Sequence, residues 1–154
     1  MSNFQYRGFD LSGRVAIITG GGTGIGKAIA LGMAQAGADL VLIGRRIKPL
    51  KEVAKEVQAM GRKALCHSAD IRKLAQIRSV VRETVREFGK IDILVNNAAV
   101  AIGQPMERIT EKVWDETMDI NLKGAFFCAQ AVGMVMIRQK KGKISGLRIV
   151  IVGD

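Results

Sequence analysis

The feature that most constrains this chain is an apolar run that ends in a cluster of glycines. Residues 15–19 read Val-Ala-Ile-Ile-Thr, and glycines follow at positions 20, 21, 22, 24 and 26. Behind them an apolar residue recurs every fourth position from Ile25 to Met33, which predicts a helix over 27–36. A strand, a glycine turn and a helix in this order leave free backbone N–H groups at the helix start, where phosphate can bind. We therefore expect this turn to hold the pyrophosphate of a dinucleotide.

Two other readings of the glycine cluster stay open. The positions of Gly20, Gly24 and Gly26 do not give G-x-G-x-x-G. Residues 21–27 satisfy the first seven positions of the phosphate loop G-x-x-x-x-G-K-[ST], but the eighth is Ala28, which has no hydroxyl to place on Mg²⁺. A phosphate-loop nucleotide triphosphatase is therefore the first alternative, and a glycine-rich loop without a ligand is the second.

Length and composition indicate one soluble globular domain over residues 1–154. Hydrophobic residues make up 48% and charged residues 25% of the chain, which is ordinary for such a domain. The two cysteines suggest neither a disulfide nor a metal site, so we expect a cytoplasmic protein. His67 is the single histidine, which excludes a histidine-based metal site or triad, and we expect no metal. The N-terminus lacks the apolar core of a signal peptide, and the least polar run, 124–137, is too short to span a bilayer.

The chain is strongly basic, with a formal net charge of +10. The charges are scattered, however, and no aromatic residues are interleaved with them as single-strand binding would require. Arg78, Arg82 and Arg86 recur four apart, which is typical of the solvated face of an amphipathic helix. We therefore expect neither a nucleic-acid partner nor a membrane.

Apolar runs alternate with helical patterns along almost the whole chain. The predicted strands are 15–19, 40–43, 63–68, 91–95 and 147–152, and the predicted helices are 27–36, 49–60, 72–88 and 110–140. Repeated β-α units predict a parallel sheet with helices on both faces, a Rossmann-type doubly wound α/β fold. Cofactor sites in such sheets lie beyond the carboxyl ends of the strands.

The end of the second predicted strand carries two arginines and no carboxylate. About 20 residues past the glycines, an acidic residue would bind the ribose 2′-hydroxyl of NAD, whereas an arginine would accommodate the 2′-phosphate of NADP. Arg45 and Arg46 stand at this place. We therefore expect NADP(H) to be preferred, with NAD(H) possible, although both arginines could instead be solvated loop residues.

Four stretches in order resemble the short-chain dehydrogenase/reductase family. The first is the turn Thr-Gly-x-x-x-Gly-x-Gly at 19–26, and the others are Asp70-Ile71, the Asn-Asn-Ala-Ala run at 96–99, and Asn121 in the last helix. The resemblance implies that Gly20 makes the tight turn, Gly24 admits the pyrophosphate and Gly26 lets helix and strand pack closely. It also implies that Asp70 and Ile71 hold the adenine and that Asn121 kinks its helix and holds a water for proton relay.

The resemblance thus implies one catalytic residue, Asn121, and a set of residues around the cofactor. Those cofactor-binding residues are Gly20, Thr23, Gly24, Ile25, Gly26, Arg45, Arg46, Asp70, Ile71, Asn97, Ala98 and Ala99. Thr23 stands where the family often has a second basic residue, and Ala99 where it usually has glycine. The implied activity is hydride transfer between a nicotinamide and a small carbonyl or alcohol substrate, such as a 3-oxoacyl compound or a sugar acid.

The resemblance covers only the N-terminal part of the family. The family's catalytic tyrosine and lysine, in the pattern Tyr-x-x-x-Lys, have no counterpart, because Tyr6 is the single tyrosine. Ser145 lies before the predicted fifth strand and not at its end, so it is not assigned the family's catalytic serine role. We expect a sheet truncated after its fifth strand and loss of the helix that forms the family's usual homo-oligomeric interface. We also expect the isolated chain to bind cofactor weakly or not at all and to be inactive by itself.

A third alternative is a non-catalytic nucleotide-binding or pairing module. Phe126, Phe127 and Met134 would supply its interface, although their helical spacing is also typical of a core.

Overall fold

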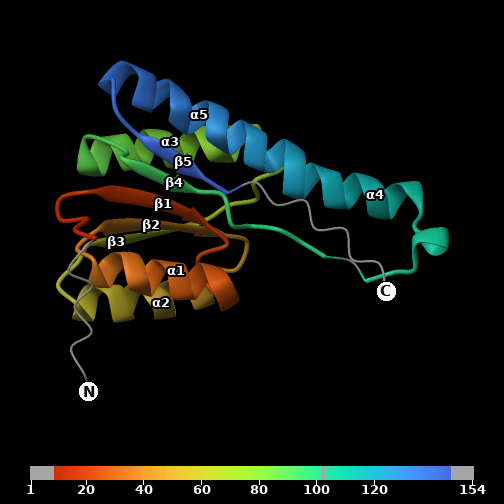
Figure 1. The fold of residues 1–154 in the computed structure, drawn as a ribbon, viewed down its shortest axis with the longest axis horizontal. Helices are drawn as coiled ribbons and strands as arrows, with labels where there is room; N and C mark the ends of the chain where they lie inside the picture. Colours follow the sequence, from red (N-terminus) through yellow and green to blue (C-terminus); the bar gives the residue numbers. More distant parts are fainter. Residues whose placement is uncertain (1–8, 102, 147–154) are drawn as a thin grey trace.

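A computed structural model describes residues 9–101 and 103–146, whose strands form a single parallel sheet (Figure 1). The sheet has the order β3-β2-β1-β4-β5, and every neighbouring pair is parallel. The strands are β1 (Val15–Thr19), β2 (Asp39–Gly44), β3 (Ala64–Ser68), β4 (Ile93–Val95) and β5 (Lys143–Ser145). The chain reverses direction across the sheet between β3 and β4, which confirms the predicted doubly wound α/β fold.

Helices cover both faces of the sheet. They are α1 (Gly24–Gln35), α2 (Ile47–Ala59), α3 (Leu74–Phe88), the 3₁₀ turn η1 (Met106–Arg108), α4 (Glu111–Met118), the π-helical turn η2 (Asp119–Gly124) and α5 (Ala125–Gln139). Figure 1 shows α1 and α2 on one face, with α3 and the long α4–η2–α5 rod on the other. Thr110 begins the rod as predicted, its side chain accepting from the Val113 N–H at 3.4 Å.

The central strands are continuous apolar runs because both of their faces are buried. In β1, Ala16 and Ile18 pack against α1 and α2, whereas Ile17 packs against the α3 and α5 side. All five residues of β1 are buried. The strand that leads into the glycine turn is therefore held in the core on both of its faces.

The structure shows the fifth strand of the sheet at residues 143–145. The predicted strand 147–152 lies outside the described residues, and β5 forms at 143–145, paired with β4. The prediction that Ser145 precedes the strand is therefore wrong: Ser145 ends β5, and its carbonyl oxygen accepts from the Asn96 N–H at 2.9 Å. Strand propensity alone did not point to 143–145, because pairing register with a neighbouring strand is decided by tertiary contacts.

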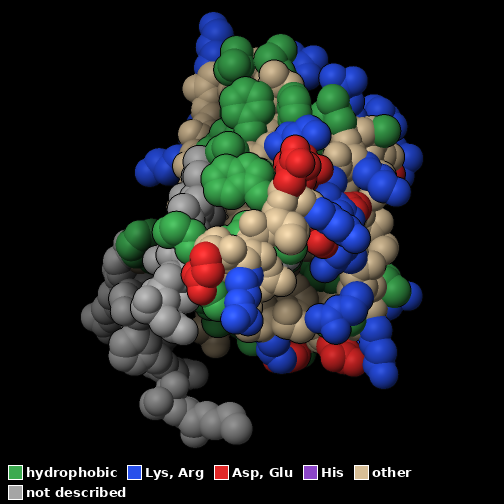
Figure 2. Space-filling model, turned by 90° about the vertical axis from the view of Figure 1, so that its right-hand side faces the viewer, with side chains coloured by type: hydrophobic (Ala, Val, Ile, Leu, Met, Phe, Trp, Pro, Cys, Tyr) green, Lys and Arg blue, Asp and Glu red, His purple; other side chains and the backbone are tan. Residues whose placement is uncertain are grey.

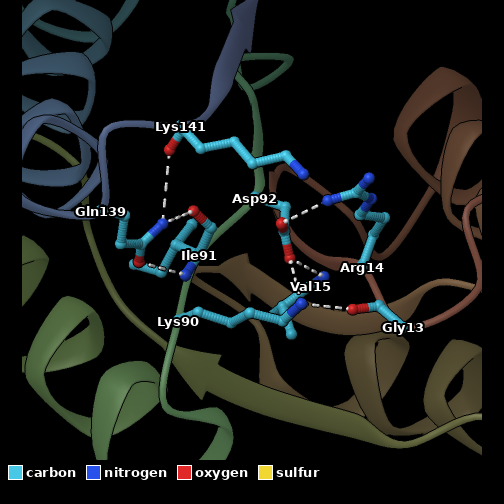
Figure 3. A network of polar contacts seen from close by, with 8 residues as sticks. All are labelled: Gly13, Arg14, Val15, Lys90, Ile91, Asp92, Gln139 and Lys141. Atoms are coloured by element: carbon cyan, nitrogen blue, oxygen red, sulfur yellow. Dashed lines mark hydrogen bonds and ion pairs between the residues drawn. The ribbon is translucent and has the colours of Figure 1, made fainter.

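A buried carboxylate ties the start of β4 to the start of β1 (Figure 3). Asp92 accepts from the Val15 N–H at 3.0 Å, and its carboxylate pairs with Arg14 and Lys90 at 3.1 Å each. Burial alone would raise the pKa of Asp92, but the Val15 N–H and the two cations together lower it. This network lies at the amino ends of the strands, far from the carboxyl edge where ligands bind such sheets.

The rod from Glu111 to Gln139 is long and apolar enough to cross a membrane by length and composition alone. The helix that forms is longer than the apolar run 124–137 on which the expectation of no membrane span was based. One face of the rod packs into the core through Cys128, Val132 and Met136, and a core helix meets the same length and composition test.

Candidate functional site

A pocket of about 450 Å³ opens at the carboxyl ends of β1, β2, β3 and β4. Its lining includes every residue predicted to bind cofactor except Gly24: Gly20, Thr23, Ile25, Gly26, Arg45, Arg46, Asp70, Ile71, Asn97, Ala98 and Ala99. Gly24 belongs to the same turn, with nothing within 4 Å of where a Cβ would lie. Four separate segments thus meet at the sheet edge where doubly wound folds bind their ligands.

The glycine turn is closed so tightly that two of its positions have no room for a side chain. Gly20 has φ +69°, and a Cβ there would lie 2.9 Å from the Asn97 amide nitrogen. A Cβ on Gly26 would lie 2.1 Å from the Gly20 carbonyl oxygen and 2.6 Å from the Asn97 amide nitrogen. The first turn of α1 therefore rests directly on the end of β1, which is possible only without side chains.

The amino end of α1 presents unused hydrogen-bond donors to this pocket. Within the described residues, the backbone N–H groups of Gly24, Ile25 and Gly26 have no acceptor, and the Thr23 side chain makes no capping bond. No acidic residue lies in the first turn of α1. Free N–H groups at the positive end of a helix dipole form a site for an anion such as a phosphate.

Two exposed arginines stand beside this anion site. Arg45 and Arg46 follow β2 and line the pocket, and neither forms an ion pair with another described residue. Figure 2 views the molecule from this edge and shows lysine and arginine side chains gathered along one side of it, with apolar side chains above. An unpaired guanidinium can bind a phosphate through two parallel hydrogen bonds.

Asp70, by contrast, is already engaged. Its carboxylate accepts from the Arg72 guanidinium, with Nη2 at 2.6 Å from Oδ2 and Nε at 3.0 Å from Oδ1. This hydrogen bond is the main reason that the pKa of Asp70 is lowered, and the Arg72 N–H and the charge of Arg45 act in the same direction. The Asp70 N–H donates to Gln76 Oε1 at 2.7 Å. Asp70 is therefore a fixed, ionised acceptor at the pocket wall.

Thr19, which the sequence pattern did not single out as a site residue, joins two walls of the pocket. Thr19, 1% exposed, accepts from the Asn97 and Ala98 N–H groups at 3.0 Å each. The Asn97 side-chain amide returns two bonds, to the Thr19 and Gly20 carbonyl oxygens at 3.0 and 3.3 Å. A hydroxyl residue ending an otherwise apolar strand was the available signal. These bonds lock the turn after β4 against the glycine turn.

Asn121 lies next to the pocket and clamps its edge. Its side chain is 3% exposed, accepts from the Val100 N–H and donates to the Val100 carbonyl oxygen, both at 2.8 Å. It belongs to the π-helical turn η2, a local widening of a helix that is frequent at functional sites. Both polar atoms of its amide thus hold the backbone of a pocket residue.

The geometry also bears on the alternatives. Lys27, which a phosphate loop would turn toward phosphate, forms an ion pair with Glu56 at 2.7 Å. Of the three residues suggested as an interface, Phe126 and Met134 are 56% and 54% exposed, whereas Phe127 packs against the core. The expectation of a core role thus holds only for Phe127.

Comparison with known proteins identifies a family and several similar proteins. The family profile described as short chain dehydrogenase matches residues 14–147. The 2-dehydro-3-deoxy-D-gluconate 5-dehydrogenase of Escherichia coli is 43% identical over 134 residues, 87% of this chain and 52% of that protein. The 3-oxoacyl-[acyl-carrier-protein] reductase FabG of Staphylococcus epidermidis is 35% identical over 88% of this chain and 56% of that protein.

Solved structures of oxidoreductases are also similar to this chain. A metagenomic short-chain oxidoreductase in complex with NADP is similar with a TM-score of 0.82 at 36% identity, covering 87% of this chain and 61% of that one. An NAD⁺-bound xylitol dehydrogenase is similar with a TM-score of 0.84 at 32% identity, covering 87% and 52%. The chain thus spans about half the length of the curated relatives it matches.

Proposed function

This chain belongs to the short-chain dehydrogenase family, and from that membership we propose that its pocket binds a nicotinamide dinucleotide with the diphosphate on the α1 turn. The observation that carries the proposal is that N–H groups at Gly24–Gly26 and two arginines, none of them with a partner among the described residues, meet in one pocket. The first N–H groups of any helix lack acceptors within the helix, and here they face a pocket that also contains two guanidiniums.

We propose further that NADP(H) is preferred over NAD(H). Arg45 and Arg46 supply two guanidiniums after β2, where the 2′-substituent of the adenosine ribose would lie, and the carboxyl end of β2 carries no carboxylate that would repel a 2′-phosphate. Solved relatives carry one or the other cofactor, NADP in the metagenomic oxidoreductase and NAD⁺ in the xylitol dehydrogenase. The arginines are therefore the basis of this preference.

The remaining pocket residues receive roles consistent with their contacts. Asp70, held ionised by Arg72, would accept from the adenine amino group, with Ile71 beside the ring. The 97–99 segment would pass close to the nicotinamide half of the cofactor. Asn121 would act as a positioning residue, because its amide fixes the Val100 backbone, with the proton-relay role as the finer proposal.

For the protein as a whole we propose hydride transfer between the nicotinamide and the carbonyl or alcohol carbon of a small substrate. One relative is named as a dehydrogenase of 2-dehydro-3-deoxy-D-gluconate, a sugar acid, and another as a reductase of 3-oxoacyl-[acyl-carrier-protein]. Both substrates contain such a carbon. The 154 residues hold one tyrosine, Tyr6, and so lack a tyrosine four residues before a lysine to supply the proton. We therefore propose that this chain alone binds cofactor without turning substrate over.

Titration of the purified chain with NADP⁺ and NAD⁺ tests the proposal. We expect NADP⁺ to bind about tenfold more tightly, and the double variant Arg45→Gln/Arg46→Gln to remove that difference while leaving NAD⁺ affinity within about threefold. The control variant Lys48→Gln/Lys51→Gln removes the same charge from α2 at residues that do not line the pocket. Equal loss of NADP⁺ affinity in both variants would show that bulk charge, and not the arginines, sets the preference.

A further inference from the structure

A second hollow lies between α3 and α5, at the opposite edge of the molecule from the cofactor pocket. It encloses about 470 Å³, within the roughly 300 to 1,000 Å³ typical of small-molecule sites. α3 supplies Val81, Arg82 and Val85, and α5 supplies Val135, Arg138 and Gln139. In Figure 1 both helices run side by side and end at the side of the sheet where the strands begin. We call this hollow the α3–α5 groove.

The floor of the α3–α5 groove is aliphatic. Val81 is 8% exposed and belongs to the core, and Val85 and Val135 are partly buried against it. Valine methyl groups on two helices thus form an apolar surface. An alkyl chain can bind there by burying apolar area, and no polar group of the floor would lose its hydration.

The rim of the groove carries two guanidiniums without carboxylate partners. Within residues 9–101 and 103–146, neither Arg82 nor Arg138 forms an ion pair. Arg82 uses Nη2 for a 3.4 Å bond to Ser79 Oγ, and Arg138 uses Nε for a 3.1 Å bond to the Met134 carbonyl oxygen. Since a guanidinium has five N–H donors, most of the donors of both arginines stay available.

The third polar side chain of the groove is fixed. Gln139 accepts from the Ile91 N–H at 3.0 Å and donates to the Ile91 carbonyl oxygen at 2.9 Å, as Figure 3 shows. Its amide therefore binds the backbone before β4 and makes one end of the groove rigid. The groups of the groove that can still bind a ligand are therefore the two arginines and the aliphatic floor.

We propose that the α3–α5 groove binds a free alkanoate of medium chain length, with the alkyl chain on Val81, Val85 and Val135 and the carboxylate between Arg82 and Arg138. A planar guanidinium matches a carboxylate in geometry, and the net charge of +10 draws anions to the surface. The C-termini of α3 and α5 lie nearby, and the partial negative charge of their helix dipoles disfavours a bound anion. Binding of the carboxylate therefore depends on the arginines and not on the helix ends.

The test is a titration of the whole chain, followed through its ¹³C-labelled valine methyl groups, with octanoate, 1-octanol and acetate as separate probes. We expect octanoate to shift the methyl signals of Val81, Val85 and Val135 and to bind about tenfold more tightly than either other probe. Octanol has the chain without the charge and acetate the charge without the chain. If octanol binds as tightly as octanoate, or if the shifts occur elsewhere, the proposal is wrong.

A pair of charge-matched variants makes the test independent of bulk charge. Arg82→Gln/Arg138→Gln should reduce octanoate affinity about tenfold and leave octanol binding unchanged. Arg78→Gln/Arg86→Gln removes the same charge from exposed positions of α3 outside the groove and should leave octanoate affinity unchanged. Equal weakening of octanoate binding in both variants would overturn the proposal. Competition between octanoate and NADP⁺ would do so as well, and so would binding only to vesicles that contain the fatty acid.

Discussion

Replacing Gly26 by alanine separates the packing of the glycine turn from ordinary helix propensity. A Cβ at Gly26 would lie 2.1 Å from the Gly20 carbonyl oxygen and 2.8 Å from the Gly20 carbonyl carbon, so backbone must move away from backbone. Overpacking of this kind costs about 1–3 kcal/mol of folding free energy, and a rigid backbone neighbour places the value at the upper end of that range. The displaced turn should also lose its fit to a diphosphate.

The matched control lies two turns further along the same helix. Gly32 is in the interior of α1, and a Cβ there would meet nothing within 4 Å. Gly32→Ala should therefore stabilise the chain by up to about 1 kcal/mol through helix propensity. The same chemical change in one helix is thus predicted to have opposite signs at two positions.

Urea unfolding followed by circular dichroism gives both free energies, and titration with NADP⁺ gives the affinities. We expect Gly26→Ala to lower the unfolding midpoint and to weaken NADP⁺ binding more than tenfold, whereas Gly32→Ala raises the midpoint and leaves binding unchanged. A Gly26→Ala chain as stable as the parent, with unchanged affinity, would refute the close approach of α1 to the end of β1.

Two further substitutions test buried polar contacts. Thr19→Val removes the acceptor shared by the Asn97 and Ala98 N–H groups and should lower the free energy of unfolding in urea by about 1–3 kcal/mol. Thr84 is equally buried but bonds only within its own helix, so Thr84→Val should lower this free energy by less. Equal losses in the two variants would show that the Thr19 bonds between segments add no stability of their own. Asp92→Asn should also destabilise the chain near neutral pH. Because the folded pKa of Asp92 is lowered, its contribution is present above the unfolded value of about 3.9 and is lost as the pH falls below it. Unfolding curves of parent and Asp92→Asn should therefore converge below about pH 4, and a difference that stays constant down to pH 2.5 or so would contradict the lowered pKa.

The parts of the fold and site that sequence could predict are those encoded locally. The order of strand, glycine turn and helix needs no knowledge of tertiary structure, because Gly20 and Gly26 reveal their backbone geometry by residue type alone. Arg45 and Arg46 were predicted to lie in the site because the carboxyl ends of neighbouring parallel strands share one edge of a sheet.

The parts that could not be predicted depend on contacts between distant segments. Nothing in the local sequence shows that Thr19 accepts from the turn after β4, or that the Asn121 side chain binds the Val100 backbone. The fifth strand shows the same limit. Strand propensity gave no sign that residues 143–145 pair with β4. Pairing register and side-chain partners are decided by tertiary structure, which a single sequence does not display.

The claim on which the account depends is that backbone N–H groups at the start of α1 bind a dinucleotide diphosphate. The most direct measurement is the change in ¹⁵N–¹H amide signals as NADP⁺ is added to the labelled chain, with Mg²⁺–ATP as the comparison ligand. We expect the largest changes at Gly24, Ile25 and Gly26 with NADP⁺ and much smaller ones with Mg²⁺–ATP. Unchanged signals at these three residues on saturation with NADP⁺, or an equal response to the triphosphate, would contradict it.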